Sequence, residues 1–237
     1  MNKTKLEKIL YYFVLSTLIL SIIFIGIRII YAPVYSDSEA IRTKSSYSLM
    51  FVQCILGVVA LHLPDIFMKR FSRKVPSLMV VMYIIFLYAA IFLGEVRSFY
   101  YNIPNWDTIL HTFSGGMLGA LGFSIVTLLN KTEKIPMNLS PFFVSLFAFC
   151  FAITIGVFWE FYEFSFDGLL GLNMQKFMLE DGTQLIGRSA LTDTMEDLFV
   201  DALGAFVMST LGYLSIKYKG VLVEKLHFEK IIKTKDK

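Results

Sequence analysis

The sequence is poor in charged residues and has almost no cysteine. Only 17% of its 237 residues are charged, against 56% that are hydrophobic, and this lies outside the range of an ordinary soluble domain. Cys54 and Cys150 both stand inside apolar runs without a CxxC or Cys/His spacing, which argues against a disulfide framework or a zinc site built on cysteine. No repeat or low-complexity segment is evident. These absences indicate an integral membrane protein with no role for nucleic acid.

Six apolar runs are long enough to cross a bilayer, which needs about 20 helical residues. They predict an all-α, polytopic helix bundle that forms a single membrane domain over residues 1–237. The first run is too long for the apolar region of a signal peptide, and no small-x-small cleavage site follows it. The expected spans are residues 9–30, 47–63, 77–94, 108–129, 139–161 and 197–216.

The distribution of charge predicts the orientation of these spans. Sixteen of the 22 Lys and Arg residues lie in the N-terminal segment, the 62–76 and 130–136 loops and the tail from Lys217. By the positive-inside rule these segments, and both termini, face the cytoplasm. We therefore expect a multi-pass protein of the plasma membrane, whose basic tail meets anionic lipid headgroups.

The long connection over residues 165–192 is expected to lie on the outer side of the membrane. It is rich in glycine and contains the apolar stretch LNMQKFML between polar residues. This pattern predicts a short amphipathic helix at the interface.

Three of the predicted spans carry acids at their outer ends, whereas the other three have none in their interiors. Side chains three or four residues apart share one face of a helix, and a charge near the bilayer centre costs about 2.5–3.5 kcal/mol or more. Protons, arginines or a metal must therefore compensate these acids. The ionisable groups lie within or just beyond the outer ends of these spans: Asp107 and His111 at the fourth, Glu160, Glu163 and Asp167 at the fifth, and Asp193, Glu196, Asp197 and Asp201 at the sixth.

Many carboxylates beside a single imidazole predict a divalent metal site. Such ligands suit Mg²⁺, Mn²⁺ or Ca²⁺, with Zn²⁺ or iron as further candidates. The expected metal ligands are Glu160, Asp197, Asp201 and Asp193. The expected catalytic residues are His111, as a general base or a further ligand, Asp107 and Glu163. Asp107 or Glu163 is also expected to complete the metal shell. Arg188 and Arg97 are the candidate clamps for a phosphate or lipid headgroup.

Simpler roles remain open for several of these residues. Asp107 and Asp193 stand at helix starts, where a capping aspartate is common. Glu163 suits a solvated interface, and His111 suits a hydrogen bond to a backbone carbonyl. The glycines of SGGMLGALG, together with Gly204, predict close packing between helices.

The motifs together resemble the VanZ-like membrane proteins, and most closely the YjdF-like bacterial inner-membrane family. WDxxxH, WExxE and an arginine ahead of DxxxDxxxDALGA follow one another over about residues 105–211. VanZ-like proteins are associated with resistance to a glycopeptide antibiotic. The chain departs from their pattern where Glu163 replaces Gln and Asp201 replaces Asn, and both changes add negative charge. The site residues that the resemblance implies are Asp107, His111, Glu160, Arg188 and Asp197.

Three functions are compatible with these features. The first is a metal-dependent enzyme of the outer leaflet, acting as a hydrolase or transferase on a lipid-linked or phosphate-bearing envelope precursor, although the chain lacks a phosphatase or CDP-alcohol transferase signature. The second is a non-catalytic, metal-stabilised protein that binds envelope lipids or partners. The third is a cation or proton-coupled transporter, but the inner halves of the spans offer no evident polar exit. The oligomeric state is left open.

The predicted topology is testable with reporter fusions. Alkaline phosphatase needs its disulfides to be active, and these form outside the cytoplasm. A fusion after Asp181 should therefore be active, whereas fusions after Glu133 or at the C-terminus should be inactive, with fluorescent-protein fusions giving the reverse pattern. An active phosphatase at the C-terminus would contradict the assignment.

Overall fold

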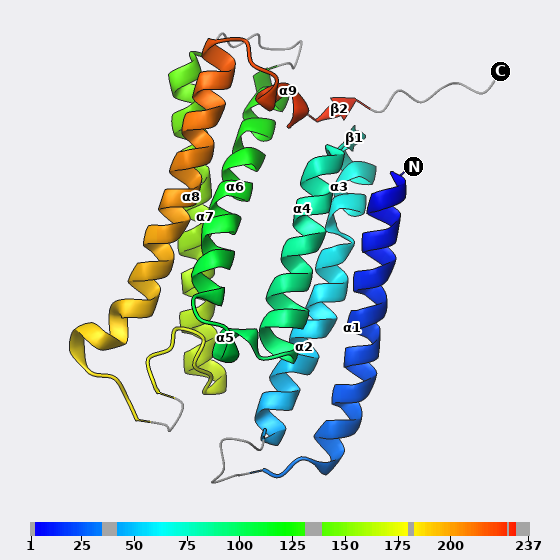
Figure 1. The fold of residues 1–237 in the computed structure, drawn as a ribbon, viewed down its shortest axis with the longest axis vertical. Helices are drawn as coiled ribbons and strands as arrows, with labels where there is room; N and C mark the ends of the chain where they lie inside the picture. Colours follow the sequence, from blue (N-terminus) through cyan, green and yellow to red (C-terminus); the bar gives the residue numbers. More distant parts are fainter. Residues whose placement is uncertain (1–2, 35–41, 131–138, 180–182, 227, 231–237) are drawn as a thin grey trace, which may run out of the picture. The chain divides into compact units, whose positions relative to one another are not determined.

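The chain folds almost entirely into helices. A computed structural model describes residues 3–34, 42–130, 139–179, 183–226 and 228–230 (Figure 1). Among these residues, six helices are long and apolar enough to cross a membrane: Lys5–Tyr31, Ser46–Phe71, Ser77–Val96, Trp106–Val126, Pro141–Leu170 and Gly187–Lys217. This confirms the predicted all-α, multi-pass membrane fold.

The described residues fall into two compact units that divide between Trp106 and Asp107, and residues 228–230 belong to the first. The helices of the first unit are α1 (Lys5–Tyr31), α2 (Lys44–Leu61), α3 (Leu63–Phe71), α4 (Ser77–Leu87), the π-helix η1 (Tyr88–Val96) and α5 (Phe99–Asn102). Its two-residue strands β1 (Arg73–Lys74) and β2 (Glu229–Lys230) pair antiparallel.

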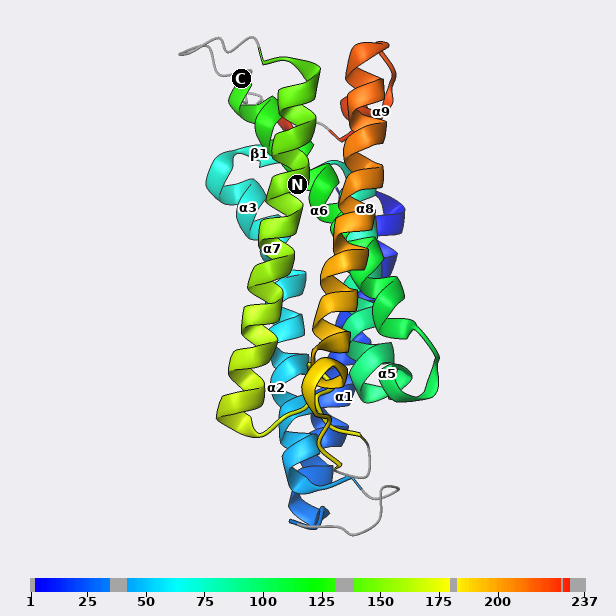
Figure 2. The same ribbon diagram turned by 90° about the vertical axis from the view of Figure 1, so that its left-hand side faces the viewer.

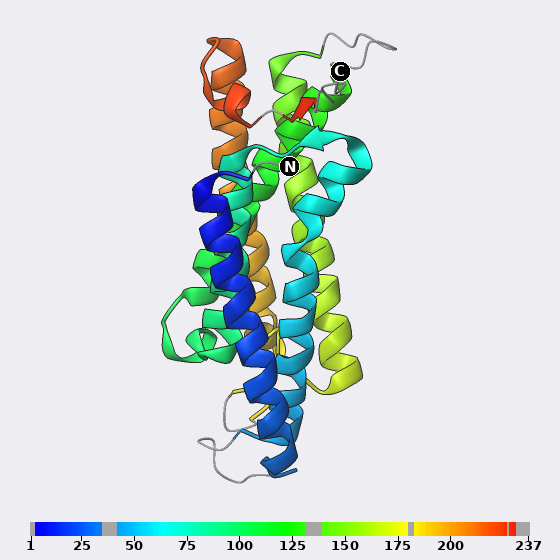
Figure 3. The same ribbon diagram turned by 90° about the vertical axis from the view of Figure 1, so that its right-hand side faces the viewer.

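The core of the first unit is apolar. Helices α1 and α2 run side by side (Figures 1 and 3), and Leu18, Cys54 and Ile84 are buried among them and α4. Thr4 and Glu7 form a capping box that satisfies backbone N–H groups at the start of α1. The buried residues of this core cluster that the structure describes are all hydrophobic, in agreement with the sequence pattern.

The second unit holds the acid-bearing helices. Its elements are α6 (Trp106–Asn130, with Trp106 in the first unit), α7 (Pro141–Leu170), the 3₁₀-helix η2 (Gly187–Leu191), α8 (Thr192–Lys217) and α9 (Leu222–Lys225). Helices α7 and α8 lie side by side along much of their length (Figure 2). Phe123 of α6 and Ala148 of α7 are fully buried in the apolar end of this bundle.

Glycines bring the backbone of α6 into contact with its neighbours. A Cβ atom on Gly115 would lie 2.2 Å from the carbonyl oxygen of Asp201, and one on Gly204 would lie 2.1 Å from that of Thr112. Towards α7, a Cβ on Gly122 would lie 2.8 Å from the Cα of Ala148. The predicted close packing is confirmed, and it sets α8 against the part of α6 that carries His111.

At the acid-bearing end of the second unit, α7 and α8 extend beyond the ends that the sequence predicted. α7 continues past residue 161 to Leu170, with Glu163 and Asp167 buried on one side of the helix and the aromatic Phe164 exposed between them. It ends at Gly171, whose φ of +64° is favourable for glycine. α8 begins at Thr192, five residues before the expected start.

The outer connection differs from the predicted amphipathic helix. Its described residues 171–179 and 183–186 contain no helix, and Met178 pairs with Gln184 in an isolated antiparallel bridge. Asp167 explains part of this conformation, since its carboxylate oxygens accept hydrogen bonds from the backbone N–H groups of Met174 and Gln175. These bonds hold the chain back against the end of α7 instead of letting it lie as a separate helix.

The glycine contact predicts a specific stability effect. Gly204→Ala should lower the free energy of unfolding by about 1–3 kcal/mol, because its methyl group forces α6 and α8 apart. The thermal unfolding temperature of the purified protein in detergent is the measurement. Gly168→Ala is the matched control in α7, since no atom lies within 4 Å of the added Cβ; equal unfolding temperatures for the two variants would contradict the packing.

Candidate metal centre

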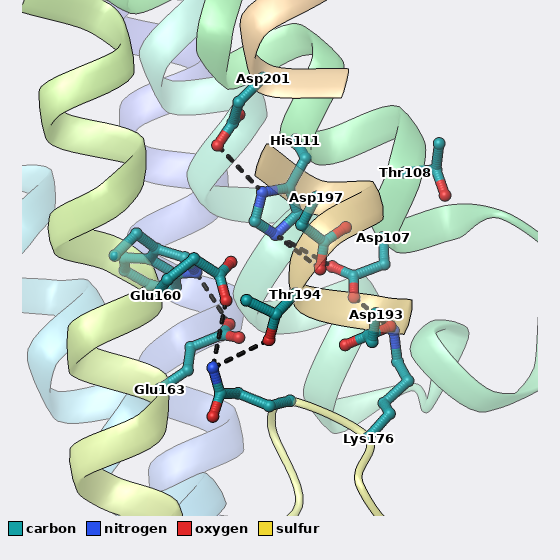
Figure 4. A network of polar contacts seen from close by, with 12 residues as sticks. Asp107, Thr108, His111, Glu160, Glu163, Lys176, Asp193, Thr194, Asp197 and Asp201 are labelled. Atoms are coloured by element: carbon teal, nitrogen blue, oxygen red, sulfur yellow. Dashed lines mark hydrogen bonds and ion pairs between the residues drawn. The ribbon is translucent and has the colours of Figure 1, made fainter. Parts of the chain in front are cut away.

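The acids of α6, α7 and α8 converge on His111 within the second unit (Figure 4). Their side chains are withdrawn from the surface: Asp197 and Asp201 are each 3% exposed, Glu160 4% and His111 7%. Burial of this kind is rare for carboxylates unless each is paired or binds a cation. The predicted gathering of acids from these three helices is therefore found.

One nitrogen of His111 faces two carboxylates. The Nε2 atom lies 3.6 Å from Oδ1 of Asp107, one helical turn earlier in α6, and 3.7 Å from Oδ2 of Asp197 in α8. These separations are too long for hydrogen bonds. The three ligand atoms lie within 4.8 Å of one another, and Asp197 Oδ2 is buried with no hydrogen-bond partner among the described residues.

The other nitrogen of His111 is held by Asp201. Its Nδ1 lies 3.3 Å from Oδ2 of Asp201, while Oδ1 of the same carboxylate accepts a hydrogen bond of 3.0 Å from Ser114. α7 has a glycine where this carboxylate approaches it: a Cβ on Gly156 would lie 2.7 Å from Oδ2. A histidine whose second nitrogen is fixed by a carboxylate is the usual arrangement behind a metal ligand.

Two glutamates of α7 face the same cluster. Oε2 of Glu160 accepts a hydrogen bond of 3.3 Å from the Gln175 side chain, whereas its Oε1 is buried with no hydrogen-bond partner among the described residues. Glu163 is 7% exposed, and its Oε1 accepts a hydrogen bond of 2.8 Å from the indole of Trp159. Each glutamate is thus held through one oxygen.

Lys176 supplies a positive charge from the connection between α7 and α8. Its Nζ lies 2.5 Å from Oδ2 of Asp107 and 2.7 Å from Oδ1 of Asp193. Burial alone would lower the pKa of this ammonium, but the two carboxylates outweigh that effect and raise the pKa above its ordinary value. Asp193 therefore forms an ion pair with Lys176. It does not cap α8, whose N-cap residue is Leu191.

The segment over residues 173–178 carries Lys176 and is bound to the helices on both sides of it. The side-chain Nε2 of Gln175 donates hydrogen bonds to Glu160 of α7 and, at 2.9 Å, to Thr194 of α8. Asn173 exchanges two hydrogen bonds with the backbone of Met178, which closes the segment into a tight loop. This loop, which we call the strap, ties α7 to α8 at the acidic end of the bundle.

The geometry favours a different division of roles from the one that the sequence suggested. Asp107 and His111 join Asp197 as the potential ligand set, whereas Asp201 faces the far nitrogen of His111 and Asp193 binds Lys176. Arg188 in η2 and Arg97 at the end of η1 both have exposed side chains, and Arg97 belongs to the first unit. The side chain of Glu196 is exposed, which gives no indication of a role in the cluster.

Sequence reasoning missed the residues that hold the acids in place. Ser114 follows His111 by three residues and so shares its face, a signal that could have been read. Lys176 is the one lysine in the 165–192 connection, but only folding shows that it reaches Asp107, 69 residues earlier. Gln175 and Thr194 gave no signal beyond being polar.

Comparison with known proteins agrees with this architecture. A family described as predicted membrane protein (DUF2238) matches residues 38–218. A protein of Thermotoga maritima, described as uncharacterized, is 27% identical over 152 residues, which cover 63% of this chain and 69% of the relative. No solved structure matches the chain significantly. These findings name neither VanZ-like nor YjdF-like proteins, so that resemblance stays a prediction. By the extent of the family match, the chain is a multi-pass membrane protein of the DUF2238 family.

Proposed function

We propose that the second unit binds a divalent cation through Asp107, His111 and Asp197, and that the protein is a metal-dependent membrane enzyme. One observation carries the proposal: a ring nitrogen of His111 and one oxygen of each aspartate lie within 4.8 Å of one another, and His111 and Asp197 are buried. Metal–ligand bonds are about 2.0–2.3 Å long, so a single ion could contact all three atoms.

The donor set narrows the choice of ion. Two carboxylates with one imidazole suit Mn²⁺, Zn²⁺, Fe²⁺ or Mg²⁺ and offer nothing to a soft, thiol-seeking metal. Neither cysteine belongs to the cluster, since Cys54 is buried in the apolar core of the first unit and Cys150 is exposed on α7. Three protein ligands also leave positions for water or substrate, as catalytic metal sites do.

The surrounding residues support hydrolysis or group transfer. A divalent ion bound here would polarise a phosphoryl oxygen or lower the pKa of a bound water. Glu160 is suited to accept a proton, since its Oε1 is buried and has no hydrogen-bond partner among the described residues. Asp201 and Ser114 would keep the His111 ring oriented. In this assignment His111 acts as a ligand and not as a general base.

The proposed substrate is a lipid-linked or phosphate-bearing molecule of the cell envelope. Its support is the predicted position of the acidic end at the outer face of the membrane, together with the exposed Arg188 at the start of the last span. The guanidinium of an arginine matches phosphate with two parallel hydrogen bonds. A substrate held in the bilayer would reach the site laterally from the lipid phase.

A structural metal is the second candidate function. The potential ligands come from α6 and α8, and the strap fastens the same end of the bundle to α7. An ion at this point would stabilise the packing of the three helices without any reaction. Removal of the metal would then lower the unfolding temperature, and no lipid phosphate would be turned over.

Asp197→Asn tests the metal site and its use together. The substitution keeps the size of the side chain but removes one negative ligand, so Mn²⁺ or Zn²⁺ binding measured by calorimetry should weaken at least tenfold. Hydrolysis of a polyprenyl diphosphate or phosphatidic acid in detergent should fall to background, as it should for wild-type protein after chelation. Glu196→Gln, one residue earlier and exposed, is the control and should behave as wild type.

Absence of metal binding in the wild-type protein would refute the site itself. Binding without turnover of any lipid phosphate would leave the structural role in place of the enzymatic one.

Asp201→Asn tests whether the second nitrogen of His111 is held for a metal. Loss of such a supporting carboxylate typically costs 10–100-fold in metal affinity, and a decrease of that size is expected here with little change in unfolding temperature of the metal-free protein. An unchanged affinity would mean that Asp201 does not orient the ligand.

A further inference from the structure

We propose that the ammonium of Lys176 is a built-in second cation of this centre, occupying a position that would otherwise bind a second divalent ion. The inference rests on the proposed metal site and adds to it a rule for how many ions the protein binds. Lys176 then determines that one metal, and not two, is held among these acids.

The first support is the set of atoms around the ammonium. Nζ lies 2.5 Å from Oδ2 of Asp107 in α6 and 2.7 Å from Oδ1 of Asp193 in α8. Hard oxygen atoms at such positions also attract Mg²⁺, Mn²⁺ or Ca²⁺. The second oxygen of Asp193, Oδ2, is buried and has no hydrogen-bond partner among the described residues. Without Lys176, Oδ2 of Asp107 and Oδ1 of Asp193 would face the vacated position, and Oδ2 of Asp193 belongs to the same carboxylate.

The second support is the way in which Asp107 divides its two oxygens. Oδ1 faces Nε2 of His111 in the proposed metal site, at 3.6 Å, whereas Oδ2 contacts Lys176. A carboxylate that offers one oxygen to each of two positive charges is the bridge expected between neighbouring ions in a two-metal site, where the ions are about 3.5–4 Å apart. Here one of the two charges is part of the chain.

The third support is that the strap fixes Lys176 at this point. Gln175 is bound through its side chain to Glu160 and Thr194, and through its backbone N–H to Asp167. Lys176 itself has a φ of +45°, a backbone conformation that non-glycine residues seldom adopt. A disfavoured backbone that persists at a polar cluster is a feature of functional sites. The ammonium is thus placed by several contacts and not only by its attraction to the acids.

Metal stoichiometry tests the inference. Metal-free protein is equilibrated with excess Mn²⁺, freed of unbound ion by rapid desalting, and analysed for manganese per chain. Wild type should retain one ion. Lys176→Met should retain two, because its neutral side chain leaves Asp107 Oδ2 and Asp193 to the second ion. The double variant with Asp193→Asn should return to one, since the vacated position then lacks its main ligand.

Control variants separate charge from the mere presence of a mutation. Lys176→Arg keeps the positive charge and should retain one ion. Lys219→Met, at an exposed lysine of the second unit, should also retain one. Lys176→Gln is a polar neutral variant that should again give two ions and that serves if the methionine variant is poorly folded.

The possible results have distinct meanings. Two ions in the wild-type protein, or one ion in both neutral variants, would overturn the role of Lys176 while leaving the metal site intact. No ion in the wild-type protein would instead refute the metal site on which the inference rests.

Discussion

The structure of the second unit depends on the cost of burying negative charge in an apolar bundle. Carboxylates from three helices point to one place, and a buried charge without a partner is too costly to persist. The chain supplies compensation from several sources: the imidazole of His111, the ammonium of Lys176, and donors such as Ser114, Gln175 and Trp159. These donors satisfy one oxygen of a carboxylate and leave the other directed into the cluster.

Close helix packing makes this compensation possible. Contact between the backbones of α6 and α8 at Gly115 and Gly204 places Asp201 against His111, and Gly156 of α7 leaves room for the carboxylate between the helices. Larger residues at these points would separate the helices and admit lipid or water between the acids and their partners. The glycines and the acids therefore belong to one arrangement, in which small residues bring helices together and polar residues use the resulting proximity.

The family match agrees with the membrane architecture and covers the acidic cluster. The family match spans residues 38–218 and so includes every residue of the cluster. The apolar first unit gives the chain its additional spans, while the second unit carries the polar chemistry. The buried oxygen and nitrogen atoms of this cluster are compatible with the proposed metal site in either role, catalytic or structural.

The sequence by itself determined the helical class, the six spans and the gathering of acids at one end of α6, α7 and α8, because length, hydropathy and helical spacing are local properties of the chain. It did not determine which oxygen faces which partner. Only the tertiary structure places Asp201 behind His111, lengthens α7 so that Glu163 is buried, and brings Lys176 to Asp107 across 69 residues. These contacts join segments far apart in the chain, and their existence depends on how closely the helices pack and where the strap folds back.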